Sequence, residues 1–204
     1  MRDEIVHRGA IHAVRKLALS IGPYARYYLL KRHARELVAE DINERIQAAG
    51  ARANWRGMQL ATIDDDAIEF ARLEWVRYYG EGTHSGFPHS WETLLKKHRA
   101  RPSFFDLAVW QIVDGRRVLQ ALALGKPSNA KTHLSLNWVE RSFAPTYLRG
   151  ALVPILACAE EYAKLLGSYR VVIKDPVDPG KYQRYGYAPF RIKGAKGNYL
   201  SKEL

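Results

Sequence analysis

One long segment near the start of the chain repeats its apolar positions every three or four residues. This segment covers residues 24–48, and its repeat predicts an amphipathic helix. The side chains that set the repeat are Tyr27, Leu30, Ala34, Val38, Ile42 and Ile46. An earlier helix is predicted over residues 5–20, because Gly22-Pro23 is a strong helix breaker between the two segments.

The pattern changes from helical spacing to alternation after residue 57. Residues 58–63 alternate as a strand does, and the acidic cluster Asp64-Asp65-Asp66 behind them predicts a helix N-terminus. The runs 104–113 and 118–124 flank Asp114-Gly115, which is a strong hairpin turn signal. The two runs therefore form a predicted β-hairpin, which Gly125-Lys126-Pro127 should end.

The rest of the chain supplies one more antiparallel strand and then a strand–helix–strand unit. The strand at 133–140 should place Leu134, Leu136, Trp138 and Glu140 on one side of a sheet. The remaining predicted segments are helices ending at 79, 99, 166 and 185 and strands at 170–174, 189–192 and 198–202. From residue 58 the order is β-α-α-β-β-β-α-β-α-β-β, which is typical of mixed α/β or α+β folds.

The chain divides near Gly50 into a helical extension, residues 1–50, and a domain, residues 51–204. Residues 1–35 hold eight lysines and arginines against two acids. Such helices either bind nucleic-acid phosphates or are ordinary solvated faces of helices packed on the domain, and we favour the second interpretation.

Composition and charge narrow the class of protein. The chain has 204 residues, 47% of them hydrophobic, and a net charge of +11, which attracts polyanions without specifying a fold. Its one cysteine, Cys158, lies in an apolar helical run and is predicted to be a core residue. The longest apolar run, Ala151–Ala159, is far shorter than the ~20 residues of a membrane span, so we expect a soluble cytoplasmic protein.

A motif near the C-terminus carries a family resemblance. Strand residues Val171-Val172-Ile173 are followed by Asp175-Pro176 and then by Tyr182-Gln-Arg-Tyr-Gly186-Tyr187. The spacing and the element order resemble those of the GCN5-related N-acetyltransferases (GNAT), which have Asn-Pro and Tyr-Glu-Lys-Leu-Gly-Phe at these places. The resemblance covers residues 58–204. It implies a central mixed, mostly antiparallel sheet flanked by helices.

The resemblance implies specific catalytic roles. The family tyrosine protonates the leaving coenzyme A thiolate, and that role falls on Tyr182. The base that accepts the proton of the amine is commonly a glutamate near the third strand, and Glu140 is the local candidate.

The resemblance also implies a pyrophosphate loop at the start of the long helix. Here the loop reads Arg149-Gly150-Ala151-Leu152-Val153-Pro154, with Leu152 and Pro154 in place of the two family glycines. Arg149, Gly150 and Ala151 are the residues expected to contact the cofactor phosphates, and Asp175 stands where the family has asparagine. The loop is thus a degenerate form of the family loop.

These features predict an acyl-CoA-dependent N-acyltransferase that uses acetyl-CoA or another acyl-CoA. Its acceptor would be an amine of unknown class, and it would form a homodimer. Two alternatives stay open: a GNAT-like protein that binds or modifies nucleic acid through residues 1–35, and a catalytically inactive interaction module. His84 and His89, five residues apart in a predicted loop, are a poor metal signal, so no metal site is expected.

Overall fold

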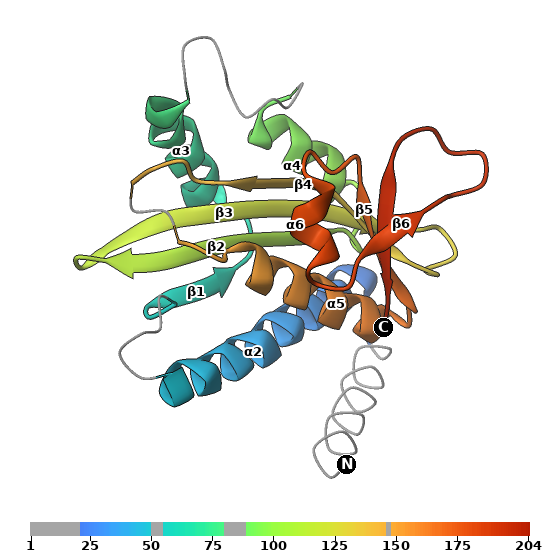
Figure 1. Cartoon of the computed structure of the whole chain (residues 1–204), viewed down its shortest axis with the longest axis horizontal. Helices are drawn as coiled ribbons and strands as arrows, with labels where there is room; N and C mark the ends of the chain where they lie inside the picture. Colours follow the sequence, from blue (N-terminus) through green and yellow to red (C-terminus); the bar gives the residue numbers. More distant parts are fainter. Residues whose placement is uncertain (1–20, 50–54, 80–88, 146–147) are drawn as a thin grey trace.

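The computed structural model of the chain describes residues 21–49, 55–79, 89–145 and 148–204. Within these residues a seven-stranded sheet has the strand order β1-β2-β3-β4-β5-β7-β6 (Figure 1). All neighbouring strands of this sheet are antiparallel except β4 and β5, which are parallel. The strands are β1 (Met58–Ala61), β2 (Phe105–Val113), β3 (Arg116–Pro127), β4 (Leu134–Arg141), β5 (Arg170–Lys174), β6 (Ala188–Phe190) and β7 (Tyr199–Glu203). This mixed, mostly antiparallel sheet confirms the predicted fold class.

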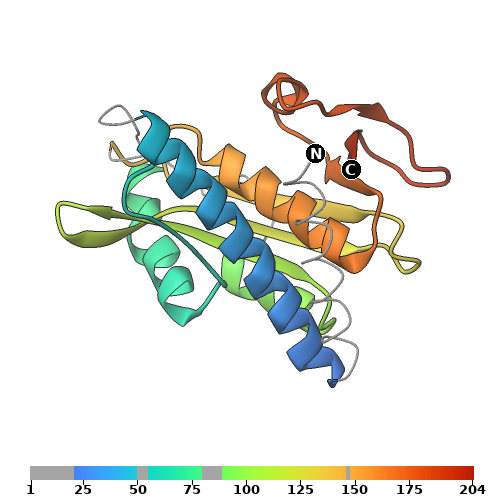
Figure 2. The same cartoon turned by 90° about the horizontal axis from the view of Figure 1, so that it is seen from below.

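Helices cover both faces of the sheet. Two long helices, α2 (Pro23–Ala49) and α5 (Leu152–Leu166), lie side by side on one face (Figure 2). The other face carries α3 (Asp65–Leu73), a 3₁₀ turn η2 (Trp75–Tyr78) and α4 (Trp91–Arg99). The short helix α6 (Pro179–Gln183) follows β5. None of the helices in the described part of the chain is long and apolar enough to cross a membrane.

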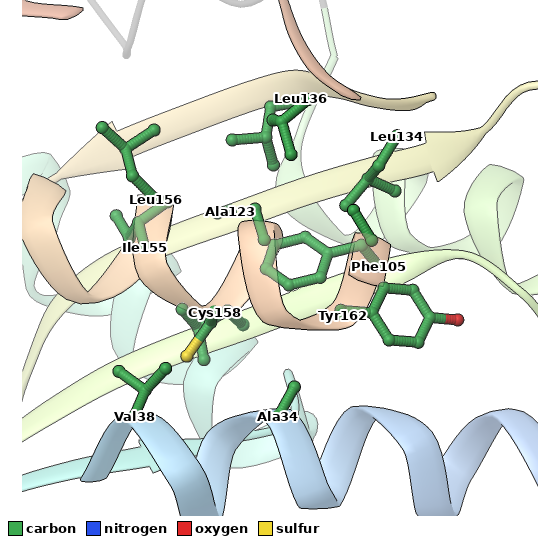
Figure 3. Packing of buried hydrophobic residues seen from close by; sticks show 14 of the residues in the cluster. Ala34, Val38, Phe105, Ala123, Leu134, Leu136, Ile155, Leu156, Cys158 and Tyr162 are labelled. Atoms are coloured by element: carbon green, nitrogen blue, oxygen red, sulfur yellow. The ribbon is translucent and has the colours of Figure 1, made fainter. Parts of the chain in front are cut away.

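The central strands are buried on both faces, so their side chains feed two hydrophobic clusters. On β2, Leu107 and Val109 face α2 and α5, whereas Ala108 and Trp110 face α3 and α4. The cluster under α2 and α5 also contains Cys158, which is fully buried between the two helices (Figure 3). Its burial confirms the prediction of a core cysteine, and the same burial raises the pKa of the thiol.

The predicted helix over residues 24–48 is confirmed as α2, and it packs as part of the core. Its apolar stripe, Leu30, Ala34, Val38 and Ile42, is buried against α5 and the sheet. Among its basic residues, Lys31 is buried in an ion pair with Asp106, and Arg32 pairs with Glu36 on the surface. Residues 5–20 and the boundary near residue 50 lie outside the described residues, so the two-part division remains a prediction.

Local turn and cap signals are confirmed where they were strongest. Asp114 and Gly115 both have positive φ, at 49° and 75°, as the two-residue turn of a β-hairpin requires. The Asp64 carboxylate accepts the backbone N–H of Ala67 at 2.9 Å and caps α3. The predicted strand end at Gly125 is wrong, because β3 continues to Pro127. A Cβ at Gly125 would lie 2.5 Å from the Ser135 carbonyl oxygen, so this glycine permits a close approach of two strands.

Candidate functional site

The parallel strands β4 and β5 separate partway along their length and leave an opening in the sheet. They pair only from Leu134↔Val171 to Leu136↔Ile173. Beyond that point β4 is irregular and β5 soon ends at Lys174. Ligands of such sheets commonly bind beyond the carboxyl ends of strands, at a place where neighbouring strands part.

A β-bulge at Asn137 decides which way the second half of β4 faces. Gly125 of β3 pairs with Leu136 and Leu124 pairs with Trp138, so Asn137 has no partner on β3. The bulge reverses the alternation. Leu136 packs in the cluster under α5, whereas Trp138 packs against the cluster under α4. The prediction that Leu134, Leu136, Trp138 and Glu140 share one side is therefore wrong, because an inserted residue shifts the period of two.

Two cavities lie on opposite faces of the sheet and meet at this opening. The cavity on the α5 face measures about 340 Å³ and is lined by residues of β4, α5, β5 and α6. The cavity on the α4 face measures about 560 Å³ and is lined by residues of α4, β3, β4 and β5. Both are lined by Asn137, Lys174, Asp175 and Val177. The Oδ1 atom of Asn137 is buried and has no hydrogen-bond partner among the described residues, so the junction contains an unsatisfied acceptor.

The α5-face cavity combines an apolar floor with a charged rim. Leu136, Ile155 and Ile173 line the floor. Arg141 and Lys181 also line this cavity, and Lys181 forms an ion pair with Asp178 on the same rim at 3.3 Å. A long, largely apolar arm with an anionic end would fit this distribution.

The loop at the start of α5 offers few backbone donors. The N–H of Ala151 donates to the Leu148 carbonyl at 3.3 Å, and that of Val153 donates to the Gly150 carbonyl at 2.9 Å. Pro154 has no N–H. A helix start usually presents its free N–H groups to an anion, and here three of these positions are closed to a ligand.

Hydrogen bonds to side chains of other segments fix the loop that contains the predicted cofactor residues. Gly150 adopts φ 85°, which favours glycine, and the Trp55 indole N–H donates to the Arg149 carbonyl at 3.3 Å. Gln120, buried in β3, accepts the N–H of Leu148 at 2.8 Å through its side chain. Of the three predicted loop residues, Ala151 lines the α5-face cavity. Contact of Arg149, Gly150 and Ala151 with a cofactor remains a prediction.

Tyr182 lines the α5-face cavity, and its predicted role as the acid remains untested. It sits on α6 and packs edge-to-face on Tyr187 with ring centroids 6.4 Å apart. Burial raises the pKa of Tyr182, and the nearby Asp178 carboxylate raises it further. The phenol therefore keeps its proton at neutral pH, as a proton donor must.

Asp175 lines both cavities, but its carboxylate is engaged with the protein. Its Oδ1 accepts the backbone N–H of Asn198 at 2.8 Å, and its own N–H donates to the Asn198 carbonyl at 2.7 Å. A Cβ on Gly197 would lie 2.6 Å from the same oxygen. Asp175 thus fastens the turn before β7 to the end of β5, and its predicted contact with a cofactor is untested.

Glu140 is buried on the α4 side of the sheet. Its two carboxylate oxygens accept hydrogen bonds from the Tyr79 hydroxyl and the Trp91 indole N–H. Burial raises its pKa, and the two hydrogen bonds oppose that change. Neither of the two cavities at the opening is lined by Glu140, so its predicted role as the base also remains untested.

His98 is a chemically suitable base that sequence reasoning missed. It lines the α4-face cavity and its ring Nδ1 lies 2.8 Å from the Leu94 carbonyl oxygen. A carbonyl can only accept, so Nδ1 carries the hydrogen and Nε2 keeps the lone pair of the neutral ring. Burial lowers the pKa of His98, and the positive charge of Lys126 adds to that effect. Its spacing of four residues from the buried Leu94 was the signal available in the sequence.

No metal centre is visible in the part of the chain that the structure describes, because no group of three or more histidine, cysteine, aspartate or glutamate side chains converges there. His84 lies outside the described residues.

Several solved structures share this fold. PaiA N-acetyltransferase from Thermoplasma acidophilum, solved with coenzyme A, is 16% identical over 72% of this chain and 99% of its own, with a TM-score of 0.51. An acetyltransferase from Thermus thermophilus is 13% identical over 72% of this chain and 97% of its own, with a TM-score of 0.50. N-acetylglutamate synthase from Neisseria gonorrhoeae is 15% identical over 72% of this chain and 35% of its own, with a TM-score of 0.52.

Sequence comparison alone identifies no relative. No protein-family model matches the chain, and no curated protein matches it. The assignment therefore rests on strand order, on the position of the single parallel pair within the described sheet and on the superposition with these acetyltransferases. The chain therefore has the fold of these acetyltransferases, the GCN5-related N-acetyltransferase (GNAT) fold.

Proposed function

We propose that the protein transfers an acetyl group from acetyl-CoA to an amine. The observation that carries this proposal is the pair of cavities on opposite faces of the sheet, which share Asn137, Lys174, Asp175 and Val177 at the β4–β5 opening. Two substrates that enter from opposite faces would meet at that opening. Holding two reactants in contact in this way accounts for much of the catalysis of bimolecular reactions.

The α5-face cavity is the proposed donor site. Its floor of Leu136, Ile155 and Ile173 suits the pantetheine arm, and Arg141 and Lys181 bring the charge that phosphates need. Because Pro154 lacks an N–H and Val153 donates to Gly150, side-chain cations carry more of the phosphate binding than backbone amides do.

The chemistry needs one acid and one base. The amine nitrogen bonds to the thioester carbonyl carbon and loses a proton to the base, and the carbon–sulfur bond then breaks. The departing sulfur takes the proton of the Tyr182 hydroxyl. There are two candidates for the base. Glu140 is suggested by the family resemblance, and His98 by its position in the α4-face cavity.

Binding of acetyl-CoA tests the donor site directly. Calorimetric titration should show saturable binding with a dissociation constant below about 1 mM, the usual upper range for enzyme substrates. Lys181→Glu should weaken binding several-fold, because it reverses a charge that lines the donor cavity. Lys193→Glu, an exposed change of equal charge outside the cavities, is the control. If acetyl-CoA does not bind at millimolar concentration, the proposed function is wrong.

The pH dependence of kcat separates the two bases. With His98 as the base, kcat falls as pH drops through the lowered pKa of His98, below about 6.5, because the protonated ring cannot accept a proton. The other titratable or charged side chains that line its cavity are His89, Lys97, Arg101, Lys126, Lys174 and Asp175. Of these, Lys126 also lowers the pKa of His98. His98→Gln should reduce kcat about 100-fold and remove this acidic limb.

Glu140→Gln is the matched comparison for this experiment. Should Glu140→Gln abolish the acidic limb while His98→Gln leaves it in place, Glu140 is the base. Each variant needs an unfolding measurement, since Glu140 accepts two buried hydrogen bonds that a glutamine cannot fully replace.

A further inference from the structure

The α4-face cavity, the proposed acceptor site, is strongly basic. Lys97 comes from α4, Arg101 from the segment after it, Lys126 from β3 and Lys174 from β5. Asp175 is the carboxylate among the described lining residues. Elements far apart in sequence therefore bring four cations to one cavity.

None of the four cations makes an ion pair with a carboxylate in the described part of the chain. Lys97 contacts a ring nitrogen of His89 at 2.9 Å, and Arg101 donates to the Asn129 side-chain oxygen at 3.2 Å. The Asp175 carboxylate, in turn, is bonded to the N–H of Asn198. The described residues that line the cavity thus carry a net positive charge.

One of these cations, Lys126, acts on a titratable group inside the cavity. The pKa of His98 is lowered, first by burial and additionally by Lys126. A cationic substrate in the same place would meet the same repulsion, whereas an anionic group would be attracted. A bound ammonium would also lose its proton more easily next to these cations, and the neutral amine is the form that attacks a thioester.

The cavity suits a small molecule. Its volume of about 560 Å³ lies within the roughly 300–1,000 Å³ typical of small-molecule sites. Leu94, Trp138 and Val177 supply apolar walls between the charged positions. An acceptor of a few heavy atoms can place its acidic group against Lys97 and Lys126 and its amine toward Asn137.

From these observations we infer that the acceptor is a small amine that carries a carboxylate or a phosphate, and that Lys97, Arg101, Lys126 and Lys174 recognise that anionic group. This inference rests on the transfer reaction proposed above. It separates the protein from acetyltransferases of polyamines, whose substrates carry several positive charges and no acidic group.

A panel of acceptors tests the inference with the full-length protein. Release of free coenzyme A is measured with acetyl-CoA and four kinds of amine: acidic amino acids, phosphoethanolamine, ethanolamine and spermidine. Binding of each amine in the presence of coenzyme A is measured by calorimetry. We expect at least about tenfold higher kcat/KM with an anionic amine than with ethanolamine or spermidine. The acidic amino acids and phosphoethanolamine distinguish a carboxylate from a phosphate as the recognised group.

Charge reversal tests the assigned residues. Lys126→Glu should lower the anionic-to-cationic ratio of kcat/KM by about tenfold or more, mainly through KM, because the change acts on binding. Lys193→Glu, with the same change in net charge outside the cavity, should leave the ratio unaltered. Affinity for acetyl-CoA should stay within about twofold in both variants, since neither residue lines the donor cavity.

The outcomes separate this inference from the proposed function. If acetyl-CoA binds but a neutral or cationic amine has a kcat/KM as high as that of the anionic amines, the acceptor inference is overturned. The proposed transferase function is then unaffected. The acceptor inference is likewise overturned if no anionic amine binds, or if Lys126→Glu leaves the ratio unchanged. If acetyl-CoA itself does not bind, the proposed function fails first.

Discussion

Replacing Asp106 with asparagine is expected to lower the free energy of unfolding by about 3–5 kcal/mol. Asp106 is almost fully buried, and its carboxylate accepts from Lys31 Nζ at 2.6 Å, from the Ile63 N–H at 2.9 Å and from the Thr62 hydroxyl. It thereby joins α2, β2 and the segment between β1 and α3. Without its charge, the buried Lys31 ammonium would have no counter-ion, and that is a costly state in a protein interior.

Denaturant unfolding of Asp106→Asn, followed by circular dichroism, measures this effect. The exposed pair of Asp41 and Arg45 on the same helix, α2, offers a matched control. Asp41→Asn should change stability by no more than about 0.5 kcal/mol, because that pair is solvated. A loss below about 1 kcal/mol for Asp106→Asn would show that the buried pair contributes little.

Removing both members of the pair should be milder than removing one. Burial lowers the pKa of Lys31 despite the attraction of Asp106, so desolvation outweighs the pairing at this site. The double variant Lys31→Met with Asp106→Leu should therefore be more stable than Asp106→Asn alone. The Ile63 N–H and the Thr62 hydroxyl would then lose their acceptor, which limits the recovery.

The second large effect is expected in catalysis, from Tyr182→Phe. Losing a general acid typically costs about 10²- to 10⁴-fold in rate, and kcat should fall within that range. The hydroxyl of Tyr182 makes no hydrogen bond within the described residues, so its removal should leave folding intact. Affinity for acetyl-CoA should change by less than about threefold, because the ring that packs in the donor cavity is retained.

Tyr185→Phe is the control for this experiment. Tyr185 lies three residues further on, packs against the same hydrophobic cluster and does not line the donor cavity. Its loss of a hydroxyl should leave kcat nearly unchanged. If Tyr182→Phe lowers kcat less than about fivefold, Tyr182 is not the acid. If no transfer can be measured with the unaltered protein either, while acetyl-CoA still binds, the inactive-module alternative is favoured.

Local signals in the sequence explain which parts of the fold could be predicted. Asp114-Gly115 required a hairpin because both residues tolerate positive φ, and the apolar spacing of residues 24–48 required a helix with one buried face. The order of elements follows from such local patterns. The pairing of β4 with β5 followed only through the resemblance, since no local pattern encodes which distant strands become neighbours.

Other features could not be read from the chain. The bulge at Asn137 depends on how β3 and β4 align, which turned Glu140 toward Trp91 rather than into a cavity. Lys31 looked like one more basic surface residue, but its partner Asp106 is 75 residues away. The Leu94 carbonyl sets the tautomer of His98, and burial lowers its pKa. Neither effect can be read from the residue type.

Among the described residues, the sequence by itself determined the order of the helices and strands and the C-terminal run from Asp175 to Tyr187, which contains Tyr182. Short-range sterics, periodic burial and turn chemistry suffice for those features. Only the tertiary structure decided that two cavities meet between β4 and β5, and that the one on the α4 face is lined by Lys97, Lys126 and Lys174. Charged side chains from separate elements act together only where folding brings them close to one another. The distances between them in space cannot be read from any local segment of the sequence.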